Sequence, residues 1–184
     1  MALIWQDGHR AAGYGVFKVL RGFEFSDRQC GNDKFSKGAL HMRVCGCEIS
    51  ASEVRLAVVH HDDEGGVEML RLGTTRLELN DDTSEADLRS VLADLQEFAQ
   101  EHEIDVFAIK TRAKKGRMAG GAVSFKIETL IQLVEGSQTK FVNPVALSHF
   151  AKNDLDEYPE KLPVYLKNAF LSGAYALTKP GFLG

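Results

Sequence analysis

Apolar and polar positions change their spacing along the chain, and each spacing indicates one type of secondary structure. Two short apolar runs, residues 43–49 and 54–60, are separated only by residues 50–53, which predicts an antiparallel hairpin. A third strand is expected within residues 67–79, with a bend near Gly73. This part of the chain is therefore predicted to form strands alone.

The next segment has the spacing of an amphipathic helix. Ser84 is the expected N-cap, and Asp87 stands at the position of the capping-box acid. One face of this helix carries Leu88, Val91, Leu92, Leu95, Phe98 and Ala99. Burial of each large member is worth roughly 1.5–3 kcal/mol, so we expect the helix to pack on a sheet.

Strands and helices then alternate to the end of the chain. Residues 104–110 form an apolar run with little alternation, which is typical of a strand covered on both faces. A helix over about residues 120–134 and a short strand over 140–142 should follow. Asn143 is the expected cap of the next helix, and the last helix is predicted over about residues 163–177. The order β-β-β-α-β-α-β-α-α predicts an α/β domain with a mixed five-stranded sheet and helices on both faces, which is the ribonuclease H-like topology.

Residues 1–41 show neither periodicity, although they contain several glycines and aromatic residues. We expect a poorly ordered extension, or a segment translated from upstream of a true start at Met42. The alternative is an appendage that packs on the domain or on a partner. The ribonuclease H-like domain is accordingly predicted to span residues 42–184.

The composition is that of a soluble globular protein, with 44% hydrophobic residues, 26% charged residues and a formal net charge of -4. Three cysteines and no secretory signal pattern predict reduced thiols and a cytoplasmic location. No apolar run is long enough to predict a membrane span. Residues 42–184 carry 16 basic and 22 acidic side chains, so any basic cluster within them is unusual.

One basic, glycine-rich segment stands out against this acidic background. Residues 110–126 contain six Lys or Arg and no acid, and they lead into the helix predicted from about residue 120. Free N–H groups at a helix N-terminus favour an anion, and glycine allows its close approach. The alternative is a solvated basic loop that balances the acidic domain. The predicted phosphate-binding residues are Lys110, Arg112, Lys114, Lys115, Arg117, Gly120 and Gly121.

The phrase KGRMAGGAV over residues 115–123, followed by FKIE over 125–128, is similar to one uncharacterised bacterial family. That family is known as the domain of unknown function, family three thousand and ten. Residues 43–49 and 170–175 also resemble it, and the resemblance covers about residues 43–177. It implies no activity.

The wider fold is similar to that of Holliday-junction resolvases and other ribonuclease H-like nucleases. The resemblance implies two metal ions held by carboxylates from the first strand, the fourth strand and the last helix. Glu48 lies near the end of the first predicted strand, but the fourth ends in Lys110 and the last helix offers no acid. A salt bridge between Glu48 and Lys110 is the simpler use of both groups. A metal-dependent nuclease would need an altered site, with Glu48 and Glu128 as catalytic candidates and Mg²⁺ as cofactor.

Other candidate chemistry is weak. Cys45 and Cys47 have neither the spacing nor the ligand number of a structural zinc site, so no metal site is predicted. The chain carries no signal for an oligomeric state. We therefore predict a domain that binds a phosphate-bearing ligand, such as nucleic acid, without a cofactor and without efficient catalysis. The altered nuclease and a protein-interaction module are the alternatives.

Overall fold

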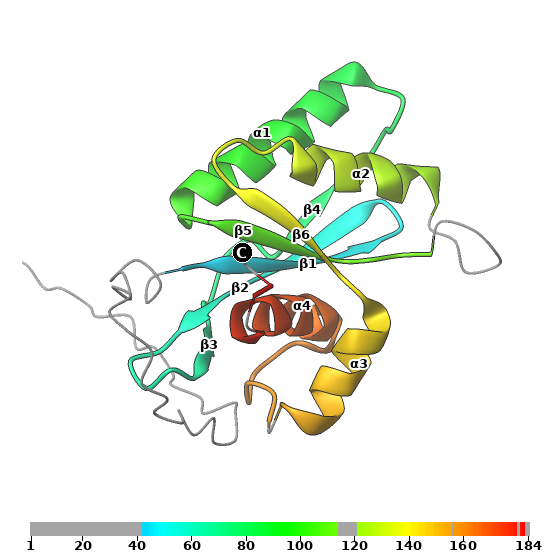
Figure 1. The fold of residues 1–184 in the computed structure, drawn as a ribbon. Helices are drawn as coiled ribbons and strands as arrows, with labels where there is room; N and C mark the ends of the chain where they lie inside the picture. Colours follow the sequence, from blue (N-terminus) through cyan, green and yellow to red (C-terminus); the bar gives the residue numbers. More distant parts are fainter. Residues whose placement is uncertain (1–41, 114–120, 156, 180, 183–184) are drawn as a thin grey trace, which may run out of the picture.

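A computed structural model of the protein describes residues 42–113, 121–155, 157–179 and 181–182. The described chain forms a mixed sheet with helices on both faces, as the sequence predicts (Figure 1). The predicted extension over residues 1–41 lies outside the described residues. None of the described helices is both long and apolar enough to cross a membrane.

The sheet is built on the predicted hairpin. β1 (Val44–Ser50) pairs antiparallel with β2 (Glu53–His61) and parallel with β5 (Val106–Lys110), which pairs in turn with the parallel edge strand β6 (Gln138–Val142). β1 and β5 are therefore the central strands, and their carboxyl ends lie at the same end of the sheet.

The third predicted strand is interrupted, so the sheet has six strands instead of five. β3 (Val67–Met69) and β4 (Arg76–Glu78) both pair with β2, and residues 70–75 leave the sheet between them. Two backbone hydrogen bonds hold the ends of this excursion: Leu70 N–H donates to Val58 O, and Leu56 N–H donates to Thr75 O, each at 2.9 Å. The excursion directs Leu70 and Leu72 against the core, which explains the bend expected near Gly73.

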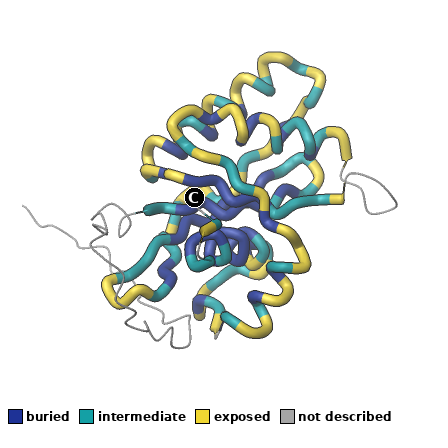
Figure 2. The backbone as a smooth tube through the Cα atoms, viewed as in Figure 1, coloured by how far each residue is buried: buried dark blue, intermediate teal, exposed yellow. Residues whose placement is uncertain are grey.

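The helices form two layers (Figure 1). α1 (Glu85–Glu101) and α2 (Ala122–Gln132) cover one face, whereas α3 (Pro144–Asn153) and α4 (Lys167–Thr178) cover the other. Both predicted caps are confirmed: Ser84 Oγ accepts from Asp87 N–H, and Asn143 Oδ1 accepts from Val145 N–H. Buried positions concentrate in the central strands and in α4 (Figure 2).

The central strands present side chains of different size to the two layers of helices. The face under α1 and α2 buries large residues, including Leu56, Phe107 and Ile109. The face under α4 is lined by small residues, and a Cβ added to Gly46 would collide with the carbonyl of Ala169 and lie 2.5 Å from Gly173 N. The backbone of α4 therefore lies directly against β1, which brings the first turn of α4 beside the end of that strand.

Candidate functional site

The carboxyl ends of β1 and β5 bring together the two charged residues that the sequence singles out there. Lys110 Nζ lies 3.6 Å from Glu48 Oε1, and Arg55 Nη1 lies 3.7 Å from Glu48 Oε2. Asn168, in the first turn of α4, donates a hydrogen bond of 2.6 Å to Glu48 Oε1. The predicted salt bridge is thus present, and this carboxylate is held by two cations and an amide.

Arg112 lies beyond the end of β5 and turns toward the opposite face. Its Nη2 donates to Ser124 O at 2.6 Å and to Glu128 Oε2 at 3.2 Å, and its guanidinium lies over the ring of Phe125. The Arg112 and Glu128 side chains are only 15% and 14% exposed. Nε and Nη1 of Arg112 are buried, and neither has a hydrogen-bond partner in the described part of the chain.

Two neighbouring members of the predicted basic cluster therefore lie on opposite faces of the sheet. Ile109 belongs to the core under α1 and α2, so alternation places Lys110 on the α4 side with Glu48. The strand ends at Lys110, and alternation no longer governs Arg112, which joins α2 instead. Sequence proximity grouped these two cations, but the structure does not bring them together.

The glycine at the start of α2 is where the sequence places it. Gly121 is the N-cap of α2. Because glycine has no side chain that could accept a hydrogen bond, N–H groups at the start of the helix have neither an intrahelical acceptor nor a side-chain cap. Lys126 does not join the site, because its Nζ forms a 2.7 Å ion pair with Asp82 Oδ2. The remaining predicted phosphate-binding residues, Lys114, Lys115, Arg117 and Gly120, lie outside the described residues.

The two carboxylates proposed for an altered nuclease are not brought together. Glu48 lies on the α4 side, where it accepts from Asn168, and Glu128 lies on α2, which covers the other face. Each carboxylate is paired with an arginine. Across the residues that the structure describes, no group of three or more His, Cys, Asp or Glu side chains is placed to hold a metal ion.

The cysteines of β1 belong to the core. Cys45 and Cys47 are both fully buried, and they point to the same face as expected for residues two apart in a strand. Burial raises the pKa of the Cys47 thiol well above its ordinary value, and its hydrogen bond with Cys45 adds to this shift. The thiol therefore stays protonated at neutral pH and has little nucleophilic character.

Sequence reasoning missed two contacts in this region. The hydrogen bond between Asn168 and Glu48 joins residues 120 positions apart, and only the close packing of α4 on Gly46 brings them together. The pair between Arg112 and Glu128 had a weak signal, since both residues lie in or beside the basic segment. Sixteen positions separate them, across a loop whose course the sequence does not specify.

The structure is similar in fold to solved structures of a Holliday-junction resolvase. The structure is similar to "Thermus thermophilus RuvC structure", with 12% sequence identity and a TM-score of 0.59, over 74% of this chain and 94% of that one. It is also similar to "T. thermophilus RuvC in complex with Holliday junction substrate", with 15% identity and a TM-score of 0.53, over the same shares of the two chains. At these identities the likeness shows the fold, and it confirms the predicted ribonuclease H-like architecture.

Comparison by sequence gives the family. No curated protein sequence matches this chain significantly. Residues 42–177, well over half of the chain, match the family described as "Protein of unknown function (DUF3010)". The family suggested by the basic glycine-rich phrase is thereby confirmed, and the chain belongs to the DUF3010 family.

Proposed function

We propose that this domain binds the phosphate backbone of nucleic acid without efficient catalysis. The observation that carries the proposal is the guanidinium of Arg112. Ser124 O and Glu128 fix its Nη2, whereas Nε and Nη1 are buried and have no acceptor in the described part of the chain. Buried N–H donors without acceptors are costly, and a turn of the Arg112 side chain that exposed them would let the oxygens of a phosphate group satisfy them.

The surroundings of Arg112 favour an anion. α2 begins at Ala122, and its N-cap, Gly121, supplies no side-chain hydrogen bond. The positive end of the helix dipole lies at this N-terminus and attracts negative charge. Lys114, Lys115 and Arg117 precede this helix in the sequence and would supply further cations to a phosphate chain. Residues 42–184 are acidic as a whole, so general attraction to nucleic acid is weak and binding would depend on this local group.

The fold supports nucleic acid as the ligand class. One of the two similar RuvC structures is described as a complex with Holliday junction substrate. By analogy with that complex, we infer that cations near the carboxyl end of this sheet would contact the phosphate backbone. This likeness is the reason to propose a polynucleotide and not free phosphate.

Efficient hydrolysis is disfavoured by the partners of Glu48. Two cations and an amide already neutralise and hold this carboxylate, and Lys110 occupies the position where a second acid is expected. A divalent ion at Glu48 would be repelled by both Lys110 and Arg55. We therefore expect no Mg²⁺- or Mn²⁺-dependent cleavage of branched DNA, duplex DNA or RNA–DNA hybrids. Robust cleavage that disappears in Glu48→Ala would establish the nuclease alternative instead.

Binding is tested with a charge-neutral double substitution. Arg112→Gln with Glu128→Gln removes the guanidinium and its carboxylate together, so the net charge of the protein is unchanged. The matched control is Arg89→Gln with Glu85→Gln, which removes an exposed ion pair on α1. Fluorescence anisotropy with a labelled four-way junction and a labelled single strand should show binding by the native chain and by the control.

The double substitution at Arg112 and Glu128 should weaken binding about ten-fold or more, which corresponds to about 1.4 kcal/mol. Thermal melts of both variants establish that each is folded. Equal affinity of the two variants would show that Arg112 does not contact the nucleic acid. Failure of the native chain to bind either probe at low salt would remove the proposal.

A further inference from the structure

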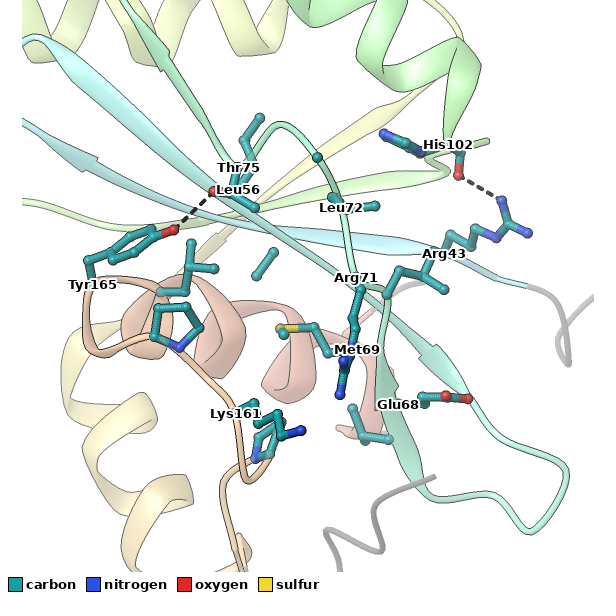
Figure 3. A pocket seen from close by; sticks show the side chains of 17 residues that line it. Arg43, Leu56, Glu68, Met69, Arg71, Leu72, Thr75, His102, Lys161 and Tyr165 are labelled. Atoms are coloured by element: carbon teal, nitrogen blue, oxygen red, sulfur yellow. Dashed lines mark hydrogen bonds between the residues drawn. The ribbon is translucent and has the colours of Figure 1, made fainter. Parts of the chain in front are cut away.

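A pocket of about 620 Å³ lies along the outer edge of β2, where residues 70–75 leave the sheet (Figure 3). In the strand order, β1 lies between β2 and β5, so this pocket is separate from the group around Arg112. Its volume falls within the range of small-molecule sites in proteins. None of the residues discussed for nucleic-acid binding lines it.

The walls of the pocket are largely apolar. Leu56 and Met69 line the side formed by the sheet, and Pro159, Pro163 and Tyr165 line the side formed by the chain leading into α4. The Tyr165 hydroxyl lies 3.2 Å from Thr75 Oγ1 and ties the two sides together, as the dashed line in Figure 3 shows. This contact links the two sides of the pocket across its opening between the sheet and the chain leading into α4.

Two exposed cations line the pocket, and neither has an ion-pair partner within the described ranges. They are Arg71, in the excursion between β3 and β4, and Lys161, which precedes α4 (Figure 3). A third cation, Arg43, is committed elsewhere, because its Nη1 bonds His102 O and Glu103 Oε2. The acid that lines the pocket, Glu68, is buried with its Oε2 3.7 Å from His60 Nε2.

We propose that this pocket binds a small molecule that joins an acidic head group to an apolar body. The carboxylate or phosphate of the head group would bind Arg71 and Lys161, neither of which forms an ion pair with a described residue. The apolar body would lie between the sheet side and the proline-rich side, where its burial drives binding. An apolar pocket with a few convergent charged groups is the usual architecture of a selective ligand site.

The probes for this site share a ten-carbon tail and differ in the head group. Decanoate and decyl phosphate carry acidic heads, decylamine a cationic head, and decanol a neutral one. Isothermal titration calorimetry of the full chain should show saturable binding of at least one acidic amphiphile. The tighter of the two acids then identifies the head group. Decylamine should bind about ten-fold more weakly than that acid, or not at all.

Variants localise the contact. Arg71→Gln with Lys161→Gln should weaken binding of the acidic probe about ten-fold or more, because both charged contacts are lost. Lys140→Gln with Lys152→Gln removes the same two positive charges from residues that do not line the pocket, and it should leave affinity unchanged. Amide chemical shifts of Leu72, Gly73 and Thr75 should move during the titration of the native chain.

Three results would overturn the proposal. The first is that neither acidic amphiphile binds the full chain. The second is equal affinity in the Arg71 and Lys161 variant and in its control, which would show that the head group does not contact these cations. The third is a set of shift changes confined to residues outside the pocket.

Discussion

The two faces of the sheet use their charged residues differently at the carboxyl ends of β1 and β5. On the α4 face, Glu48 accepts from Asn168 and lies between Lys110 and Arg55, so this carboxylate is fully engaged within the protein. On the α2 face, Arg112 has one nitrogen engaged, and two buried nitrogens lack a partner in the described part of the chain. The donors and acceptors that a charged residue leaves unpaired therefore indicate its role better than its position in the fold does.

Packing explains part of this difference. Small residues on the α4 face let the helix backbone lie against β1, which fixes Asn168 beside Glu48. The strands present larger side chains toward α2, and α2 begins after an N-cap, Gly121, that supplies no side-chain hydrogen bond. On the closely packed face Glu48 is engaged within the protein, whereas on the other face two nitrogens of Arg112 lack a partner in the described part of the chain, which is the basis of the proposed anion site.

Adding one methyl group to the closely packed face should have the largest effect on stability. In Gly46→Ala the new Cβ would collide with the Ala169 carbonyl, and backbone atoms cannot move aside as a flexible side chain can. We expect a loss of about 3 kcal/mol or more in the free energy of unfolding, measured by urea denaturation. The control is Gly73→Ala, where nothing lies within 4 Å of the new Cβ. A loss at Gly46 as small as at Gly73 would contradict the close packing of α4.

Removing the carboxylate partner of Arg112 tests the other face. Glu128→Gln leaves a largely buried guanidinium without a counter-ion, because both side chains of the pair are about 85% buried. We expect a loss of about 2–3 kcal/mol in the free energy of unfolding. The affinity for nucleic acid should not fall, since the cation itself remains. The matched control, Glu85→Gln on the exposed face of α1, should change stability by less than about 0.5 kcal/mol.

The account requires that Glu128→Gln does not reduce the affinity for nucleic acid. A reduction in affinity would count against it even if the loss of stability were larger. If Glu128→Gln abolishes binding while the protein stays folded, then the carboxylate contributes directly to the ligand site. The division between an engaged α4 face and an available α2 face would then need revision.

Removal of residues 1–41 should have the smallest effect. The family match begins at residue 42, and the segment shows neither helical nor strand periodicity. Thermal melts of the full chain and of a chain starting at Met42 should therefore nearly coincide. A large drop in the melting temperature of the shorter chain would show that this segment packs against one of the two faces.

Most elements of the fold could be predicted because their signals are local. The face formed by Val91, Leu95 and Phe98 and the cap at Asn143 depend on neighbours within a few positions. The interruption of the third strand was predicted only as a bend. The pairing of β3 and β4 with β2 depends on where residues 70–75 find space, and that is decided by tertiary packing.

The site was less predictable than the fold. The contact between Glu48 and Lys110 followed from the order of the strands, because the carboxyl ends of parallel neighbours meet. The separation of Lys110 from Arg112 could not be predicted in this way. Side chains alternate between the two faces only within a strand, so alternation does not give the direction of the chain after the strand ends. The pocket beside β2 had no sequence signal, since Arg71 and Lys161 are 90 positions apart and lie outside any motif.

The salt dependence of binding tests the central claim most directly. Each phosphate neutralised contributes a log–log slope of about -0.9 on duplex DNA and about -0.7 on a single strand. Three or four contacts by Arg112 and the cations that follow it in the basic segment would give slopes of roughly -2 to -3.6. Lys114→Ala with Lys115→Ala should weaken binding and flatten the slope by about two such contacts. Absence of binding at low salt, or a slope that the double substitution leaves unchanged, would contradict phosphate-backbone binding by this domain.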